Sequence, residues 1–114
     1  MVRFGKESRL RTRTDFDRVR REGVRVATEA LVVAVAAAPR KRVGIIVSGN
    51  VGNAVTRNRI KRVIREHFRL CRELYPLGDC VIIARPKAVK LDNKALREQL
   101  TKALKKSGTR SNCS

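Results

Sequence analysis

The stretch from Val51 to Arg72, VGNAVTRNRIKRVIREHFRLCR, combines many arginines with a regular row of aliphatic residues. With about 100° between successive residues of an α-helix, the two kinds separate onto two faces. The apolar arc holds Ile60, Val63, Ile64, His67, Leu70, Cys71 and Leu74. The basic arc holds Arg57, Lys61, Arg62, Arg65, Arg69 and Arg72, with Asn58 among them. We therefore predict a helix over 54–74 that buries one face and turns the other toward an anionic partner.

The basic face could be an ordinary solvated surface, but such surfaces usually mix both charge signs. Here only Glu66 and Glu73 interrupt it, both at its edge, and Arg59 lies on its far flank beside Glu66. Arginine outnumbers lysine on the face, and the planar guanidinium group suits bidentate contacts to phosphate and stacking on bases. The face therefore predicts binding to a nucleic acid.

A turn with two glycines, SGNVGNAV, leads into this helix. Asn53 is suited to cap the helix, because its side chain can accept a hydrogen bond from a free backbone N–H group. Gly49 and Gly52 could serve only to make the turn tight. Alternatively, the turn together with Asn53 could bind an anion at the positive end of the helix dipole. The pattern alone leaves both interpretations open.

The sequence offers no set of residues for catalysis or for a metal site in the protein alone. His67 is the only histidine, and its place in the apolar arc is typical of a packed, hydrogen-bonded side chain. Asp15 and Asp17 are two residues apart, so on a helix they point in different directions. Without a credible nucleophile, base or metal-binding cluster, we predict that the chain holds no catalytic residue.

The composition of this 114-residue chain fits one small domain with a polyanionic partner. Twenty-eight Lys and Arg residues against 10 Asp and Glu give a net charge of +18. A nucleic acid would relieve this self-repulsion, and we favour it over an anionic membrane surface. The N-terminus lacks a signal-peptide pattern, and the longest apolar run, 30–38, is too short to span a bilayer. The irregular spacing of Cys71, Cys80 and Cys113 favours free thiols, so we expect a cytoplasmic protein.

The residue patterns predict a single-domain α+β sandwich with the element order αβββαβα, in which helices cover a sheet of about four strands. A first helix is expected to begin near Thr12 or Thr14 and to end before Gly23. Strands are expected at 24–27, 31–37, 42–48 and 80–84, and a last helix capped by Asp92 at 93–106. The domain spans 1–107, with a basic arm over 1–11, and the tail 108–114 is predicted to be disordered.

The segment VGNAVTRNRIKRVIREHFR resembles the signature of the protein subunit of bacterial ribonuclease P, an Arg-Asn-Arg helix entered by Gly-Asn-Ala-Val. LRTRTDFDRVRREG, RVGIIVS and VIIARP are similar to the first helix and two strands of that family, so the resemblance covers about 9–106. The resemblance implies that an RNA subunit removes the 5′ leader of precursor tRNA with the help of Mg²⁺. It also implies that the RNA subunit binds most of this Mg²⁺. The small protein, one for each RNA, binds that RNA and the leader. The resemblance also implies a left-handed strand–helix–strand crossover, where general rules predict a right-handed one.

The resemblance assigns roles to residues of this chain. Contact with the RNA subunit is implied for Arg57, Asn58, Arg59, Lys61, Arg62, Arg65 and Arg69. Leader contact, in a cleft between the first helix and the sheet, is implied for Arg9, Arg11, Phe16 and Arg20.

Three departures from the family concern the turn and the leader cleft. Gly49 and Asn50 stand where the family often has lysines, and Arg20 and Ala34 stand where aromatic residues are common. We expect Arg20 to replace one aromatic ring by stacking its guanidinium group on a base. A non-enzymatic RNA-binding or ribosome-associated protein is the main alternative, and a basic DNA-binding protein a weaker one.

Overall fold

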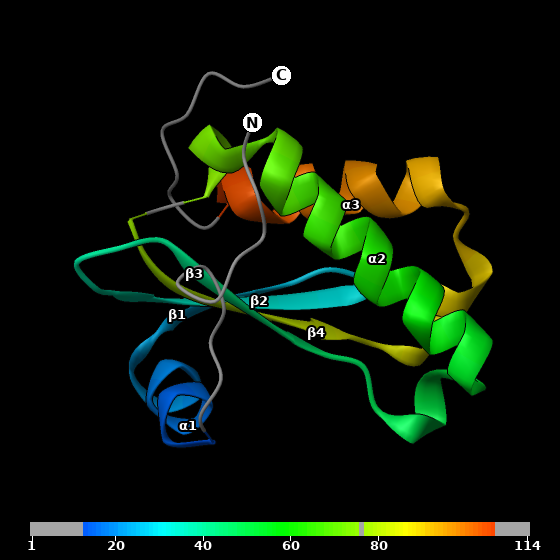
Figure 1. Ribbon diagram of the computed structural model, residues 1–114, viewed down its shortest axis with the longest axis horizontal. Coiled ribbons are helices and arrows are strands. Elements are labelled where there is room, and N and C mark those ends of the chain that lie inside the picture. The colour runs from blue at the N-terminus through cyan, green and yellow to red at the C-terminus, as the bar shows by residue number, and fades with distance from the viewer. Residues whose placement is uncertain (1–12, 76, 107–114) are drawn as a thin grey trace.

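In the computed structural model, which describes residues 13–75 and 77–106, three helices pack on a four-stranded sheet. The elements are α1 (Arg13–Glu22), β1 (Val24–Ala27), β2 (Leu31–Ala37), β3 (Arg42–Ile46), α2 (Ala54–Leu70), β4 (Gly78–Ala84) and α3 (Asn93–Lys106). Figure 1 shows α1 on one face of the sheet and both α2 and α3 on the other. The predicted α+β sandwich and its element order are confirmed. The arm 1–11 and the tail 108–114 lie outside the described residues.

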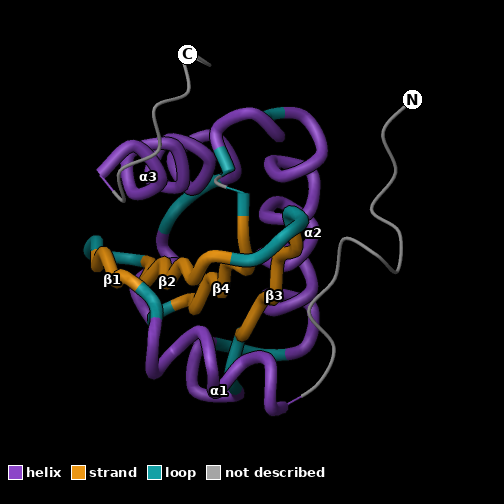
Figure 2. Tube along the Cα trace, turned by 90° about the vertical axis from the view of Figure 1, so that its left-hand side faces the viewer, coloured by secondary structure: helices purple, strands orange, loops and turns teal. Residues whose placement is uncertain are grey.

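The sheet has the order β1-β2-β4-β3, which Figure 2 shows nearly end-on. β2 pairs antiparallel with β1 and β4, whereas β3 and β4 are parallel. The chain therefore crosses from β3 through α2 to β4 over one face, and Figures 1 and 2 together show this crossover as left-handed. The crossover places α2 across the sheet with one side free.

β4 is one of the two interior strands, and it begins at Gly78 rather than at the predicted Cys80. Gly78 has a φ of +155°, and a Cβ atom at this position would collide with the carbonyl oxygen of Ala36 on β2. Glycine is therefore required where β4 enters the sheet. β3 is shorter than predicted and ends at Ile46, because the chain then leaves the sheet for the turn before α2.

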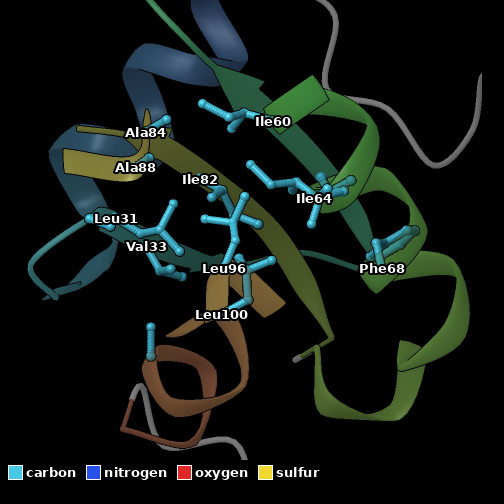
Figure 3. Close-up of a cluster of buried hydrophobic side chains, with 14 of the residues drawn as sticks. Leu31, Val33, Ile60, Ile64, Phe68, Ile82, Ala84, Ala88, Leu96 and Leu100 are labelled. Carbon is cyan, nitrogen blue, oxygen red and sulfur yellow. The ribbon is translucent and has the colours of Figure 1, made fainter. Parts of the chain in front are cut away.

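The main core lies between the sheet and the two helices α2 and α3 (Figure 3). It is almost entirely aliphatic, with Ile60 and Ile64 of α2 and Leu96 and Leu100 of α3 completely buried. A smaller cluster on the other face joins Val19 of α1 to the sheet. Burying a side chain of this size contributes about 1.5–3 kcal/mol, so these contacts fix all three helices on the sheet.

The end of α2 differs from the prediction. The helix stops at Leu70, and a short 3₁₀ turn, Arg72–Leu74, follows. The predicted apolar row included Leu70 and omitted Phe68, but Leu70 is 63% exposed and Phe68 is buried. Burial of Tyr75 explains the change, because its ring packs edge-on against Phe68 with the ring centroids 4.8 Å apart. The chain must turn back after Leu70 to make this contact.

Candidate nucleic-acid interface

The start of α2 is capped as predicted. The side chain of Asn53 accepts a hydrogen bond from the backbone N–H of Thr56 at 2.9 Å. The turn before it is a single 3₁₀ turn, Gly49–Val51, and open space surrounds a Cβ built on Gly49. Since the cap takes up the N–H of Thr56, an anion here would meet the N–H groups of Ala54 and Val55. The anion-binding role of Gly49, Gly52 and Asn53 stays a prediction.

The basic face of α2 lies opposite its buried side. Asn58, Arg62 and Arg65 are exposed, and Arg57 and Lys61 are half-buried. Within 13–75 and 77–106, the four cations of this group form no ion pair. The buried Nε of Arg57 also has no hydrogen-bond partner in that part of the chain. A buried donor without a partner costs free energy, so the side chain of Arg57 is held at a cost in stability.

Arg69 and Arg59 differ from these residues because each has a partner within the chain. Arg69 pairs with Glu66 at 3.3 Å on the surface, where screening by solvent makes such a pair weak. Arg59 donates hydrogen bonds to Oδ1 of Asn93 at 2.8 Å and to the carbonyl of Leu91 at 3.3 Å. Arg59 therefore ties α2 to the start of α3. No local pattern signals this role, because the partners lie far along the chain.

An open hollow separates α1 from the neighbouring edge of the sheet. Arg13, Phe16, Asp17, Arg20 and Ile46 line it, and its volume is about 390 Å³. Phe16 is half-buried and Arg20 is exposed, so an aromatic ring and a guanidinium group both reach this surface. The structure thus brings together two of the four residues assigned to the leader, while Arg9 and Arg11 lie outside the described residues.

Ala34 does not belong to this hollow. It is completely buried with Val19 and Val81 in the small cluster beneath α1. Phe16 and Ile46, which line the hollow, pack against this cluster, so the effect of the missing aromatic ring at Ala34 on the leader cleft stays a prediction.

A buried carboxylate that sequence reasoning missed holds α1 in place. Asp79 of β4 is 0% exposed and accepts hydrogen bonds from Arg42 of β3 and from Arg18 of α1. Arg42 also pairs with Asp15 of α1 at 3.6 Å, and the hydrogen bond that Arg42 donates to Asp79 raises the pKa of Arg42. Two strands and a helix therefore meet at one charge cluster, which fixes the wall of the hollow.

His67 is buried in a hydrogen-bonded network, as predicted. Its Nδ1 lies 2.8 Å from the hydroxyl of Tyr75, and its Nε2 lies 3.0 Å from the hydroxyl of Thr101 on α3. Burial, with a smaller contribution from the charge of Arg97, lowers the pKa of His67 to about 4. A neutral imidazole held on both nitrogens joins α2 to α3 and does not reach the surface.

Comparison with known proteins shows the family of this chain. The family model described as Ribonuclease P matches residues 4–108. The chain belongs to the ribonuclease P protein family. A ribonuclease P protein component from Desulforapulum autotrophicum is 41% identical over 106 residues, covering 90% of this chain and 91% of the relative. Another, from Syntrophobacter fumaroxidans, is 44% identical and covers 86% of each chain.

Solved structures of ribonuclease P proteins share the fold. The RNase P protein from Staphylococcus aureus, solved at 2.0 angstrom, superposes with a TM-score of 0.85 at 33% identity, covering 90% of this chain and 96% of the other. The protein from Thermotoga maritima gives a TM-score of 0.77 at 36% identity, covering 86% of this chain and 96% of that protein. The family resemblance that was first seen in the Arg57–Asn58–Arg59 helix is thereby confirmed, because it extends over most of the chain and over the fold.

Proposed function

We propose that the exposed face of α2 binds the RNA subunit of ribonuclease P. The observation that carries this proposal is the set of cations on that face, which lack an ion-pair partner in the described part of the chain. Arg57, Lys61, Arg62 and Arg65 lie on one side of a helix whose opposite side is locked in the core. RNA can thus dock on a rigid row of charges, which limits the entropy lost on binding. Arg69 can join the row by releasing its weak surface pair with Glu66.

We further propose that the RNA subunit performs the cleavage of precursor tRNA and that the protein assists it. The complex is proposed to contain one protein for each RNA subunit and to act in the cytoplasm. The described residues include no group of three or more His, Cys, Asp or Glu side chains that could hold a metal ion. The buried carboxylate of Asp79 is already neutralised by two arginines, so it does not fit Mg²⁺. His67 is enclosed in its network and cannot reach a substrate as a base. Mg²⁺ is therefore assigned to the RNA.

The 5′ leader of precursor tRNA is proposed to lie in the hollow beside α1. Single-stranded RNA binds surfaces that combine cations with rings on which bases stack. Phe16 and Arg20 supply these two features, and Arg13 adds a further cation at the same surface.

None of the helices in the described part of the chain has the length and apolar character needed to span a membrane.

Reconstitution tests the proposal. The purified protein, a bacterial ribonuclease P RNA and a precursor tRNA are combined, and the cleavage site is mapped. We expect the protein alone to be inactive and the mixture to cut at the mature 5′ end, with the largest benefit from the protein at low Mg²⁺. Specific cleavage by the RNA-free protein would overturn the assignment of the chemistry to RNA. Failure to bind the RNA would favour a different RNA partner, such as ribosomal RNA.

A further inference from the structure

α2 and α3 lie side by side and share one register. The hydrogen bonds from Arg59 to Asn93 and between His67 and Thr101 each join residues that are 34 apart. The two helices therefore run in the same direction, as Figure 1 shows, and their N-terminal ends lie at the same end of the molecule. Because α2 carries the proposed RNA-binding face, cations on the side of α3 that borders α2 can extend that face.

The outer side of α3 is strongly basic. Its exposed cations are Lys94, Arg97, Lys102, Lys105 and Lys106, and its one exposed acid is Glu98. Across the residues that the structure describes, none of these five cations takes part in an ion pair, whereas Arg18, Arg69 and Lys87 do. The exposed side of α3 thus carries positive charges that no ion pair in the described part of the chain neutralises.

Lys94 and Arg97 are placed where the helix itself does not favour them. α3 has no acid within its first turn, although Asp92 caps it from just outside, and Lys94 stands near the positive end of the helix dipole, where a cation is unfavourable. Lys94 and Arg97 are also three residues apart, at which distance like charges repel. Lys105 and Lys106 differ, because a cation in the last turn interacts favourably with the dipole. A role in stabilising the helix therefore explains the cations at its end but not the two at its start.

A groove connects the first of these cations, Lys94, to α2. Arg59, Asp92, Asn93 and Lys94 line an open hollow of about 540 Å³ between the starts of the two helices. The guanidinium group of Arg59 bridges the helices there, so positive charge continues from the face of α2 across to α3. Asp92 adds one negative charge to the lining, but its carboxylate accepts a hydrogen bond from the N–H of Ala95 at the start of α3. An extended polyanion that follows α2 can therefore meet Arg59 and Lys94 as it crosses this groove.

We infer that Lys94 and Arg97 of α3 bind backbone phosphates of RNA beside those bound by α2. This inference rests on the proposed function of the α2 face and widens the RNA-binding surface to a second helix. Contacts to phosphates carry no sequence information, so this surface sets affinity and orientation. The phosphates belong either to the RNA subunit or to precursor tRNA, and the experiment separates these two sources.

The test uses the full chain with Lys94→Ala and Arg97→Ala together. Its matched control, Arg25→Ala with Arg40→Ala, removes the same charge from exposed residues on β1 and in the turn after β2 that form no ion pair in the described part. Affinity for the RNA subunit, and affinity of the assembled holoenzyme for precursor tRNA, are measured over a series of salt concentrations. The α3 variant should flatten the plot of log affinity against log salt by about 1.4–1.8 for two lost contacts, at ~0.7–0.9 each.

The outcomes separate the possibilities. A flattened slope with the RNA subunit, or only with precursor tRNA, supports the inference and identifies the source of the phosphates. Equal slopes for the α3 variant and its control in both assays would overturn it. An Arg57→Ala, Arg65→Ala variant is measured in parallel, because an unchanged slope for that variant would refute the proposed function itself. The α3 variant should melt no lower than wild type, since alanine relieves the repulsion at the start of the helix.

Discussion

Arg42 of β3 holds the buried carboxylate of Asp79 on β4 with two hydrogen bonds, Nε to Oδ1 at 2.8 Å and Nη2 to Oδ2 at 2.9 Å. This bidentate pair joins the two parallel strands that α2 connects. Arg18 of α1 donates to the same carboxylate from the other side. The position of α1, and with it the hollow proposed for the leader, thus depends on one side chain in the middle of the sheet.

Asp79→Asn should therefore lower the free energy of unfolding by about 3 kcal/mol, because two partly buried arginines lose their counter-charge. Urea unfolding with a fixed m-value would measure this loss. Asp17→Asn serves as the control, because it removes a carboxylate from the exposed side of α1. Similar losses for both variants would show that Asp79 contributes no more than a surface acid.

Stability should fall as the pH is lowered through the range set by His67. Its pKa is about 4 in the folded protein and 6.5 when unperturbed, so the unfolded chain binds the proton first. The stabilisation is complete above about pH 6.5 and is lost progressively down to about pH 4, amounting to roughly 3 kcal/mol. Unfolding measured at several pH values should show a smaller loss in His67→Gln than in wild type. Parallel pH dependences in the two proteins would contradict this assignment.

The two faces of α2 should separate in mutagenesis. Replacing Arg57 and Arg65 with Ala should leave the melting temperature near that of wild type, while affinity for the RNA subunit falls by about 1.5–3 kcal/mol per charge-assisted contact. Replacing Ile60 and Ile64 with Ala should instead cost about 2–5 kcal/mol of stability each, because both are completely buried. Circular dichroism melts and RNA binding measured on the same samples would distinguish these effects. Unfolding caused by the arginine pair would show that the faces are assigned wrongly.

Arg20→Ala should weaken binding of precursor tRNA by the holoenzyme by about 1 kcal/mol, the low end of the range for base stacking on a protein side chain. Mature tRNA, which has no leader, should bind unchanged. Arg21→Ala is a matched control, because Arg21 is an exposed neighbour whose side chain pairs with Glu22 rather than lining the hollow. Equal losses for precursor and mature tRNA would place Arg20 at another contact.

The sequence predicted the periodic parts of this protein well. α3 spans the predicted residues 93–106, and Asp92 caps it by accepting a hydrogen bond from the N–H of Ala95. Local signals of this kind depend only on neighbouring residues. The end of α2 was misplaced because burial of Tyr75 against Phe68 depends on how the chain turns back, which helical periodicity does not contain.

The parts of the site that escaped prediction depend on distant contacts. Asp79 reads as an isolated acid before an apolar strand, and its partners Arg18 and Arg42 lie 61 and 37 residues away. Arg59 reads as part of a basic motif, yet its guanidinium group binds residues at the start of α3. One sequence shows which side chains are charged, but the fold determines which of them are already paired.

The chain has one tyrosine and no tryptophan, and that tyrosine, Tyr75, is buried between Phe68 and His67. Phenylalanine absorbs at shorter wavelength, so emission excited in the tyrosine band comes from a single ring at the junction of α2 with the chain that follows it. The ring lies on the buried side of α2, away from the cations for which RNA binding is proposed. Tyrosine fluorescence can thus follow the packing of this junction with no added label and no overlapping tryptophan signal. A variant that changes the emission has altered the interior, whereas one that binds RNA poorly with unchanged emission has lost a surface contact.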